Sequence, residues 1–388
     1  MPVRERNSVR SLPCLQSLQQ FVKRFVVLCR VSVPIAEISN NFTNVSSPSQ
    51  HLINQYTLPG AKNQKKNMSF DMPSAKWYSA QTMTQHSARG YLFVVLAACL
   101  WSMIGLFMRA LHDGFGFPAL TLAFLRAGVA FVIAFVFLAL TRRELLRLTR
   151  RSILLLMLYG AIGIGAFYFV YAQAIISTSV TTAVVLLYTA PAFVALMAWR
   201  AWREPLNRRK VIAIGLAFVG CALVARAYDP SQLSLNSIGI LFGLGAGFTY
   251  ALFTVLSKAG LKHFSPWTLM TYELGFGALF LLPFLNPTSF LPLTQPSMAW
   301  LYILGLALGP TIGAIAAFNL GLRNLPASNV SIVATIEPVM ASALAFILLG
   351  EQLELGQIIG GAMVIGGALL LAASADATQT ESPARREK

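Results

Sequence analysis

Ten apolar runs, each about as long as a membrane-crossing helix, limit the fold of this chain more than any other feature. Roughly 20 apolar residues in a helix cross the ~30 Å hydrocarbon core of a bilayer. Backbone N–H and C=O groups find no water there, so only helices or closed barrels span it. Only 11% of the residues are charged, against about 25% in soluble domains. We therefore predict an all-α membrane protein whose ten transmembrane helices cover residues 91–109, 118–140, 152–174, 178–199, 210–227, 237–257, 265–285, 298–320, 328–349 and 356–374.

Basic residues gather at every second connection between these spans. The connections after the second, fourth, sixth and eighth spans carry thirteen Lys or Arg, whereas the alternate connections carry only Arg109 and Arg226. Basic connections stay in the cytoplasm. This predicts a multi-pass protein of the cell (inner) membrane with both termini cytoplasmic, including a polar tail at 375–388. The membrane topology also accounts for the net charge of +16, so we expect a lipid bilayer and no nucleic acid as partner.

Residues 1–89 precede the first span and differ from the rest in composition. They are rich in Ser, Gln and Asn, and Lys23, Arg24 and Arg30 interrupt their most apolar stretch, so no crossing helix is predicted there. Three explanations are open: a disordered cytoplasmic tail, a basic transit peptide, or a start codon placed too far upstream, with Met68 as one alternative start. We favour the third and assign this N-terminal extension no functional role.

The two halves of the predicted bundle match each other at a constant offset of 147 residues. TAPAFVALMAWRAWREPL in the first half aligns with TIEPVMASALAFILLGEQL in the second, so that Pro191 meets Pro338 and Glu204 meets Glu351. Each half has five spans, an odd number, so the second half must enter the membrane from the opposite side. The sequence predicts two inverted five-helix repeats, a construction common among secondary transporters. The repeats cover 90–227 and 237–374.

With these residues the chain resembles the EamA family of the drug/metabolite transporter superfamily. The resemblance rests on two five-span halves, each ending in a proline followed thirteen residues later by a glutamate, and it covers residues 90 to 374. It implies a ten-helix carrier, often an exporter of amino acids or other small metabolites. It also implies that spans 3, 4, 8 and 9 line a central cavity. The chain departs from the pattern in its long N-terminal segment, and its halves differ because Ala190 stands where the second half has Glu337.

Three ionisable residues lie well inside the predicted spans, namely Arg126, Glu273 and Glu337. A charge at a lipid-exposed helix centre costs roughly 2.5–3.5 kcal/mol on insertion scales, so each should face a cavity or a partner. Arg126 and Glu273 share the 147-residue offset and lie at similar depths from opposite faces. We predict that these two interact or share one polar cavity. A buried ion pair that only fixes helix packing is the alternative.

Glu337 lies near the middle of the ninth span, directly before Pro338. Proline lacks an N–H and kinks a helix, so Pro338 and Pro191 should free the carbonyls of Ala334 and Leu187. Such irregular backbone persists at membrane depth only beside protein or water. We predict that Glu337 binds a substrate cation or takes up a proton during transport, with a purely structural role as the alternative.

Aromatic and amide side chains at matching places complete the candidate site. Ordinary packing is the alternative for each aromatic residue. Asn319 is the sharpest candidate, because a buried amide needs a hydrogen-bond partner. The candidates for substrate binding or coupling, besides the three charges, are Trp101, Tyr171, Tyr188, Phe318 and Asn319, with Tyr168, Tyr250 and Tyr272 as further members of the group.

Glycine spacing predicts close helix contacts. Gly239, Gly243 and Gly247 recur every fourth residue and should let the sixth span approach a neighbour closely. Gly356 and Gly360 suggest the same for the tenth span, as in a homodimer contact. The two repeat-equivalent glutamates, Glu204 and Glu351, each lie shortly before the next helix, whose N-terminal dipole they should complement in a structural role.

The resulting functional hypothesis is a secondary transporter of a small-molecule substrate. We expect an exporter of a small polar metabolite such as an amino acid, working by alternating access around a midplane cavity, with proton coupling as one option. A membrane-embedded enzyme is disfavoured, since the sequence has no HExxH or GxSxG motif and no histidine inside a span. A channel, or a transporter of sugars or nucleotide derivatives, is a further alternative. We expect no cofactor and no metal site, because the four cysteines show no CxxC spacing.

Overall fold

The structure is a computed structural model that describes residues 76–288, 290 and 297–380, and all regular structure in these residues is helical. The predicted all-α fold is confirmed. Most of the N-terminal extension lies outside the described residues. Where the description begins, helix α3 starts at Lys76, well before the predicted start of the first span at residue 91.

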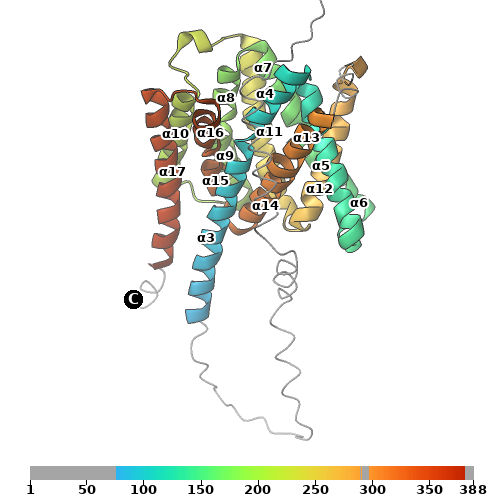
Figure 1. Ribbon diagram of the computed structural model, residues 1–388. Coiled ribbons are helices and arrows are strands. Elements are labelled where there is room, and N and C mark those ends of the chain that lie inside the picture. The colour runs from blue at the N-terminus through green and yellow to red at the C-terminus, as the bar shows by residue number, and fades with distance from the viewer. Residues whose placement is uncertain (1–75, 289, 291–296, 381–388) are drawn as a thin grey trace, which may run out of the picture. The chain divides into compact units, whose positions relative to one another are not determined.

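The first repeat runs from α3 to α10 (Figure 1). Three of its spans are built from consecutive helical segments rather than one regular helix: α3 with α4, α6 with α7, and α8 with α9. The segments are α3 (Lys76–Trp101), α4 (Ile104–Phe115), α5 (Ala119–Thr141), η1 (Arg143–Leu146), α6 (Arg150–Gly160), the π-helical turn η2 (Ala161–Ala166), α7 (Phe167–Ser177), α8 (Val180–Leu187), α9 (Ala190–Trp202) and α10 (Arg208–Val224).

The second repeat runs from α11 to α17 and again contains composite spans. Its π-helical turn η6 ends at Gly313, which is 147 residues after the end of η2 at Ala166. The segments are η3 (Pro230–Gln232) in the linker, then α11 (Ser237–Gly260), α12 (Pro266–Leu281), η4 (Leu282–Phe284), α13 (Ser297–Leu306), η6 (Ala307–Gly313), α14 (Ala314–Asn324), α15 (Ala327–Ala334), α16 (Glu337–Leu349) and α17 (Leu355–Thr380).

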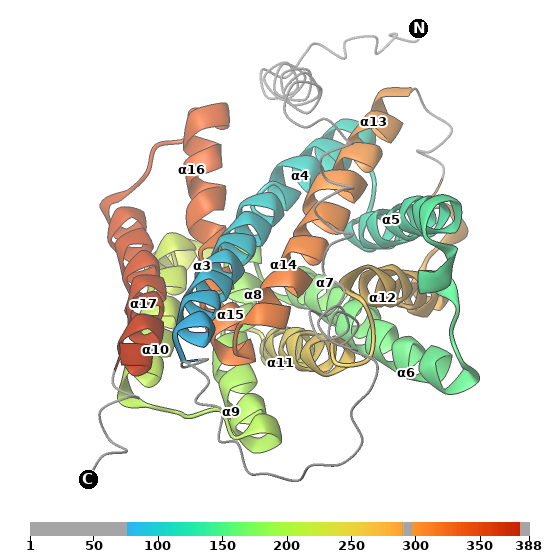
Figure 2. The same cartoon turned by 90° about the horizontal axis from the view of Figure 1, so that it is seen from below.

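The ten predicted spans all correspond to helices. Nine helical segments of the described residues are long and apolar enough to cross a membrane. The remaining predicted span is α10, which has 17 residues and packs along α17 in both views (Figure 1, Figure 2). Large apolar side chains such as Leu140, Leu241 and Ile347 are exposed on the outside of the bundle, as expected for a lipid-facing surface.

The 147-residue offset holds for helix boundaries as well as for sequence. Helix α15 begins and ends 147 residues after α8, and α16 begins and ends 147 residues after α9. Even the left-handed residues that end α9 and α16 correspond, since Arg203 has φ 54° and Gly350 has φ 69°. The two repeats therefore share one fold, although only a few of their residues are identical.

Spans 4 and 9 break next to their prolines. Helix α8 ends at Leu187 and α9 begins at Ala190, and the same interruption separates α15 from α16. Pro191 and Pro338 each occupy the first turn of the second segment, where a missing N–H leaves no hydrogen bond unmade. The helix that continues after each break is therefore a new helix with its own N-terminus near mid-span.

Polar contacts place repeat-equivalent loops at opposite ends of the bundle. Glu204, after α9, binds the start of α15, whereas Glu351 follows the far end of the same span and binds Arg109 of α4. We call these the Glu204 end and the Glu351 end. At the Glu351 end Glu354 also pairs with Arg226, and its hydrogen bond raises the pKa of Tyr228. Equivalent loops at opposite ends confirm that the repeats are inverted.

Glycines bring two pairs of helices into close contact. A Cβ atom on Gly243 would lie 2.5 Å from Leu186, and one on Gly247 would lie 2.5 Å from the Thr189 hydroxyl, so the predicted close approach of α11 is confirmed. A Cβ on Gly360 would lie 2.6 Å from the carbonyl oxygen of Gly220 on α10. The glycines of α17 thus serve a contact within the chain, which corrects their assignment to a homodimer. A homodimer remains a prediction that needs another surface.

We expect Gly360→Leu to destabilise the protein by about 1–3 kcal/mol, because overpacking forces the close α10–α17 contact apart. The matched control is Gly366→Leu on the same helix, since a Cβ there would meet no atom within 4 Å. Thermal unfolding of the detergent-purified protein should show a lowered midpoint for the first variant alone. Equal midpoints for the two variants would contradict the contact.

Candidate functional site

Aromatic rings from both repeats meet in the middle of the bundle. The Trp101 ring lies 5.1 Å from the Phe318 ring and 6.3 Å from the Tyr250 ring, measured between centroids. Phe318 also stacks on Phe253, with centroids 5.5 Å apart. These contacts join α3, α11 and α14. We call the connected set the aromatic cluster, and its members are Trp101, Phe167, Tyr168, Tyr171, Tyr250, Phe253 and Phe318.

Phe167 of α7 ties the third span into the aromatic cluster. Its ring stacks against Tyr171 at 5.9 Å and contacts Tyr250 at 5.4 Å. Tyr171 and Phe318 are repeat equivalents, so the cluster contains the same position from each half. The structure thus brings three predicted candidates, Trp101, Tyr171 and Phe318, into one connected group.

Glu337 faces this cluster from the first residue of α16. Its carboxylate lies within electrostatic range of Tyr171, Tyr188 and Tyr250. All four side chains keep part of their surface accessible, although they lie near mid-span and face one another. Within the described residues Glu337 takes part in none of the ion pairs.

A thiol from the first repeat stabilises the break between α15 and α16, directly before Glu337. The Cys221 thiol of α10 donates to the Thr335 carbonyl at 3.8 Å, and the Thr335 hydroxyl donates to the Ile332 carbonyl at 2.6 Å. Sequence reasoning gave Cys221 no role, because a lone cysteine in an apolar run shows no pattern. Its position in the structure makes it a support for the broken helix.

Arg126 of α5 lies against the aromatic cluster. The residue is 8% exposed, and its guanidinium carbon lies 4.7 Å from the centroid of the Tyr168 ring, a cation–π geometry. It is also close enough to Glu337 to act on that carboxylate electrostatically. Its Nε atom is buried without a hydrogen-bond partner among the described residues. A cation and a carboxylate, one from each repeat, therefore face the aromatic cluster.

Glu273 of α12 lies in a different environment. Only 1% of its surface is exposed, and it packs against α11 and α6. One carboxylate oxygen accepts a hydrogen bond from the Ser257 hydroxyl at 2.9 Å, and the other has no partner in the described chain. A Cβ on Gly160 would lie 2.7 Å from the Glu273 carbonyl oxygen. No ion pair joins Glu273 to Arg126 among the described residues, so the alternative of a buried ion pair is not formed there. Residue counts place each charge along its helix but do not give the direction in which the helix turns it.

Asn319 is fully buried beside Phe318, with 0% of its surface exposed. Neither its amide nitrogen nor its amide oxygen has a hydrogen-bond partner among the described residues. The Ser331 hydroxyl on α15 is buried and unpartnered in the same way. Buried polar groups are almost always paired, so the Asn319 amide marks a place where water or a substrate would bind.

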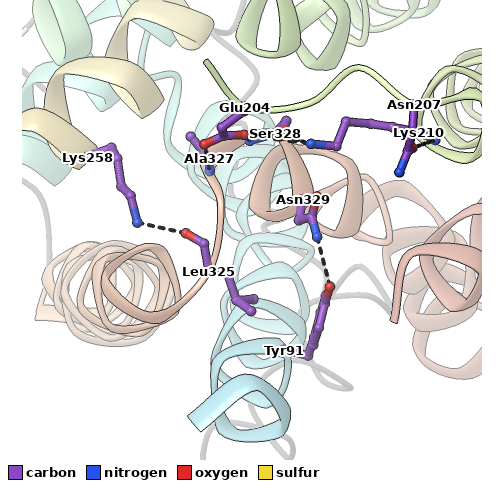
Figure 3. A network of polar contacts seen from close by, with 9 residues as sticks. All are labelled: Tyr91, Glu204, Asn207, Lys210, Lys258, Leu325, Ala327, Ser328 and Asn329. Atoms are coloured by element: carbon purple, nitrogen blue, oxygen red, sulfur yellow. Dashed lines mark hydrogen bonds and ion pairs between the residues drawn. The ribbon is translucent and has the colours of Figure 1, made fainter. Parts of the chain in front are cut away.

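The Glu204 end is closed by a polar network that joins the repeats (Figure 3). Glu204 accepts hydrogen bonds from the Ala327 N–H at 2.9 Å and from the backbone and side chain of Ser328. Lys210 donates to the Ser328 hydroxyl at 2.7 Å, and Lys258 donates to the Leu325 carbonyl at 2.8 Å. The predicted role of Glu204 is corrected here, because it caps α15 of the other repeat and not the helix that follows it.

The helix that follows, α10, is capped by Asn207, whose side chain accepts from the Lys210 N–H at 2.9 Å. Tyr272 also belongs to this end and not to the aromatic cluster, since its hydroxyl donates to the Leu146 carbonyl at 3.0 Å. No sequence signal indicated that Glu204 reaches across the repeats. In the part of the chain that the structure describes, no three His, Cys, Asp or Glu side chains lie close enough to hold a metal ion.

Comparison with known proteins decides the family. The profile of the EamA-like transporter family matches residues 88–226 and again residues 237–373. The chain belongs to this family. Its two matches coincide with the two inverted repeats, so the predicted resemblance is confirmed.

Relatives of the EamA-like chain carry transporter names. A protein of Archaeoglobus fulgidus, named an uncharacterized transporter, is 32% identical over 281 residues, which cover 72% of this chain and 95% of the relative. The uncharacterized transporter YxxF of Bacillus subtilis is 28% identical and covers 72% of this chain and 88% of its own. A general role in transport across a membrane therefore follows from the family and its members.

A solved crystal structure shares the fold. It superimposes with a TM-score of 0.63 at 18% identity and covers 75% of this chain and 99% of its own chain. At this identity the likeness concerns the fold alone.

Two buried serines allow a matched test of this geometry. Ser257→Ala should destabilise the protein by about 1–3 kcal/mol, because it removes the hydrogen bond to the buried Glu273 carboxylate. Ser331→Ala removes a hydroxyl that has no partner in the described chain, so its effect should be close to zero. Unfolding midpoints in detergent measure both. A larger loss from the second variant would show that the Ser331 hydroxyl is bonded in the folded protein.

Proposed function

We propose that this EamA-like protein is a secondary transporter of a small zwitterionic metabolite such as an amino acid, working by alternating access around Glu337. The observation that carries the proposal is the placement of Arg126 and Glu337 toward the same aromatic cluster. A guanidinium suits a substrate carboxylate, and a carboxylate suits a substrate ammonium group. The rings of the cluster supply an apolar and cation-tolerant surface for the rest of the molecule.

Proton coupling is the second part of the proposal. Glu337 lies near mid-span and takes part in no ion pair of the described chain. In transporters such a carboxylate marks a proton relay or a substrate path. Glu337 would carry a proton in one direction and release it when the substrate ammonium group arrives. The kinked start of α16 supports this role, because it leaves irregular backbone and a polar side chain at the same place.

Orientation and direction complete the proposal. The basic connections that gather at the Glu204 end favour a cytoplasmic position for that end and for both termini. The proposed location is the cell (inner) membrane, and the proposed direction is export, as the resemblance to the family implies. A membrane-embedded enzyme, or a carrier of sugars or nucleotide derivatives, is the alternative. Substrate-saturable uptake into liposomes supports a carrier, whereas product formation in detergent supports an enzyme.

We expect Glu337→Gln to slow transport by about tenfold or more, the loss that follows from removing one charged hydrogen-bond partner. The substrate is first found by comparing metabolites inside and outside cells with and without the gene, and transport is then measured in proteoliposomes. The variant should also lose the pH dependence of the rate, because glutamine does not titrate. Glu273→Gln is the buried-carboxylate comparator and should keep the pH dependence. An unchanged rate and pH profile in Glu337→Gln would remove this residue from the mechanism.

Arg126→Lys tests the zwitterion itself. Lysine keeps the charge but loses the planar fork that binds a carboxylate with two hydrogen bonds. We expect KM to rise about tenfold for the zwitterionic substrate, because one charge-assisted hydrogen bond to its carboxylate is lost. The decarboxylated amine analogue should show no such rise. Equal changes for both compounds would mean that Arg126 does not bind the carboxylate.

A further inference from the structure

Glu204 and Glu351 occupy equivalent positions in the two repeats but make very different contacts. Glu204 lies at the N-terminus of α15, where two backbone N–H groups and the positive end of the helix dipole favour a carboxylate. Lys210 lies 3.8 Å from it, and the two side chains are only 6% and 12% exposed. Glu204 therefore holds α15 against α9 through charge-assisted hydrogen bonds that are mostly shielded from water.

Glu351 makes only an open contact. Its ion pair with Arg109 spans 3.1 Å, and the two side chains are 57% and 52% exposed, so water and salt screen the attraction. The helix N-terminus that corresponds to the start of α15 is the start of α8, at Val180. That N-terminus is capped by its own Ser179, whose hydroxyl accepts from the Thr182 N–H at 3.1 Å. Glu351 does not reach it.

The helices near Glu204 are also more deeply buried than their repeat equivalents near Glu351. Every residue of α15 except Asn329 is buried, whereas only Thr182 and Ala183 are buried in its repeat equivalent α8. Likewise α9 buries five residues, whereas its equivalent α16 buries only Pro338. Helices α9 and α15 both flank the Glu204 end, and α8 and α16 both flank the Glu351 end. The structure is thus closed at the Glu204 end and loosely packed at the Glu351 end.

We propose that Glu204 and Glu351 are a matched pair of positioning residues that close opposite ends of the transport path in alternation. In the state described here Glu204 caps α15. In the opposite state Glu351 caps α8 through the N–H groups of Val180 and Thr181, and Glu204 releases α15. The inference rests on the proposed transport function, and its basis is that inverted repeats exchange conformations when such a carrier turns over.

Residues around the two glutamates fit this exchange. Thr181 is the equivalent of Ser328, so a hydroxyl is available to Glu351 at the matching place. Gln357 is the equivalent of Lys210, and its amide now donates to the Val224 carbonyl at 3.2 Å. In the opposite state this amide turns to the Thr181 hydroxyl. A neutral amide in place of a lysine makes the Glu351 closure the weaker one, so the Glu204-closed state is the resting state.

The experiment uses repeat-equivalent reporter cysteines in the full chain with Cys14, Cys29, Cys99 and Cys221 replaced. Ser331→Cys reports on the Glu204 end, where Ser331 is 1% exposed, and Val184→Cys reports on the Glu351 end, where Val184 is partly exposed. The protein is placed in vesicles of known orientation, and a membrane-impermeant maleimide is added from one side at a time. The probe is the maleimide alone, so no substrate is needed.

Glu204→Gln should raise the labelling rate of Ser331→Cys about tenfold from the Glu204 side, the factor expected for losing a charge-assisted contact. It should lower the labelling of Val184→Cys from the Glu351 side. Glu351→Gln should leave Ser331→Cys slow and Val184→Cys fast. Lys210→Gln keeps both glutamates and copies the residue of the other repeat, so it should raise Ser331→Cys labelling by a smaller factor. It serves as the second variant if Glu204→Gln does not fold.

Unchanged labelling in both Glu204→Gln and Lys210→Gln would overturn the proposal, and so would the same direction of change in Glu204→Gln and Glu351→Gln. Labelling tests the closure pair, and transport tests the carrier function. If Glu204→Gln speeds labelling of Ser331→Cys and slows labelling of Val184→Cys but no transport is measurable, the closure pair stands and the proposed carrier function is refuted. Saturable transport together with unchanged labelling would do the reverse.

Discussion

Two helices that break inside a bilayer impose the constraint on which this structure depends. Each break exposes backbone groups that lipid cannot satisfy, so neighbouring helices must supply partners. In the ninth span the Cys221 thiol reaches the Thr335 carbonyl. In the fourth span the Thr189 hydroxyl bonds to the Leu186 carbonyl, and Gly247 lets α11 lie directly against the break. The same new helix start that requires this support also turns Glu337 toward the aromatic cluster.

Inverted repeats give a symmetric path, whereas recognition of an unsymmetrical molecule needs differences between the halves. Two pairs of equivalent positions differ in charge within the spans. Ala190 corresponds to Glu337, and Arg126 corresponds to Glu273. The first repeat thus contributes a cation to the centre, and the second contributes an anion. Glu273 instead bonds to Ser257 outside the cluster, so the duplicated position serves packing in one half and faces the cluster in the other.

Sequence patterns predicted the elements of this fold much better than the contacts between them. Span positions follow from apolar length, and the repeat follows from the 147-residue offset, because both are properties of the chain alone. The different partners of Arg126 and Glu273 could not be read from the sequence, because residue count sets the position of a side chain along its helix, whereas its facing direction depends on how neighbouring helices pack. The reach of Glu204 to α15 and the use of Gly360 against Gly220 failed for the same reason, since each joins segments more than a hundred residues apart.

The matched π-helical turns set the direction of the side chains that follow them. A π-helical turn of this kind usually reflects one additional residue accommodated in a helix, and such turns are rare. Both halves contain one, in the third and eighth spans, and both turns end at equivalent positions. Tyr171 and Phe318 each follow their turn by five residues. The same widening therefore resets the helical phase ahead of both rings, and it directs an equivalent side chain from each half to the aromatic cluster.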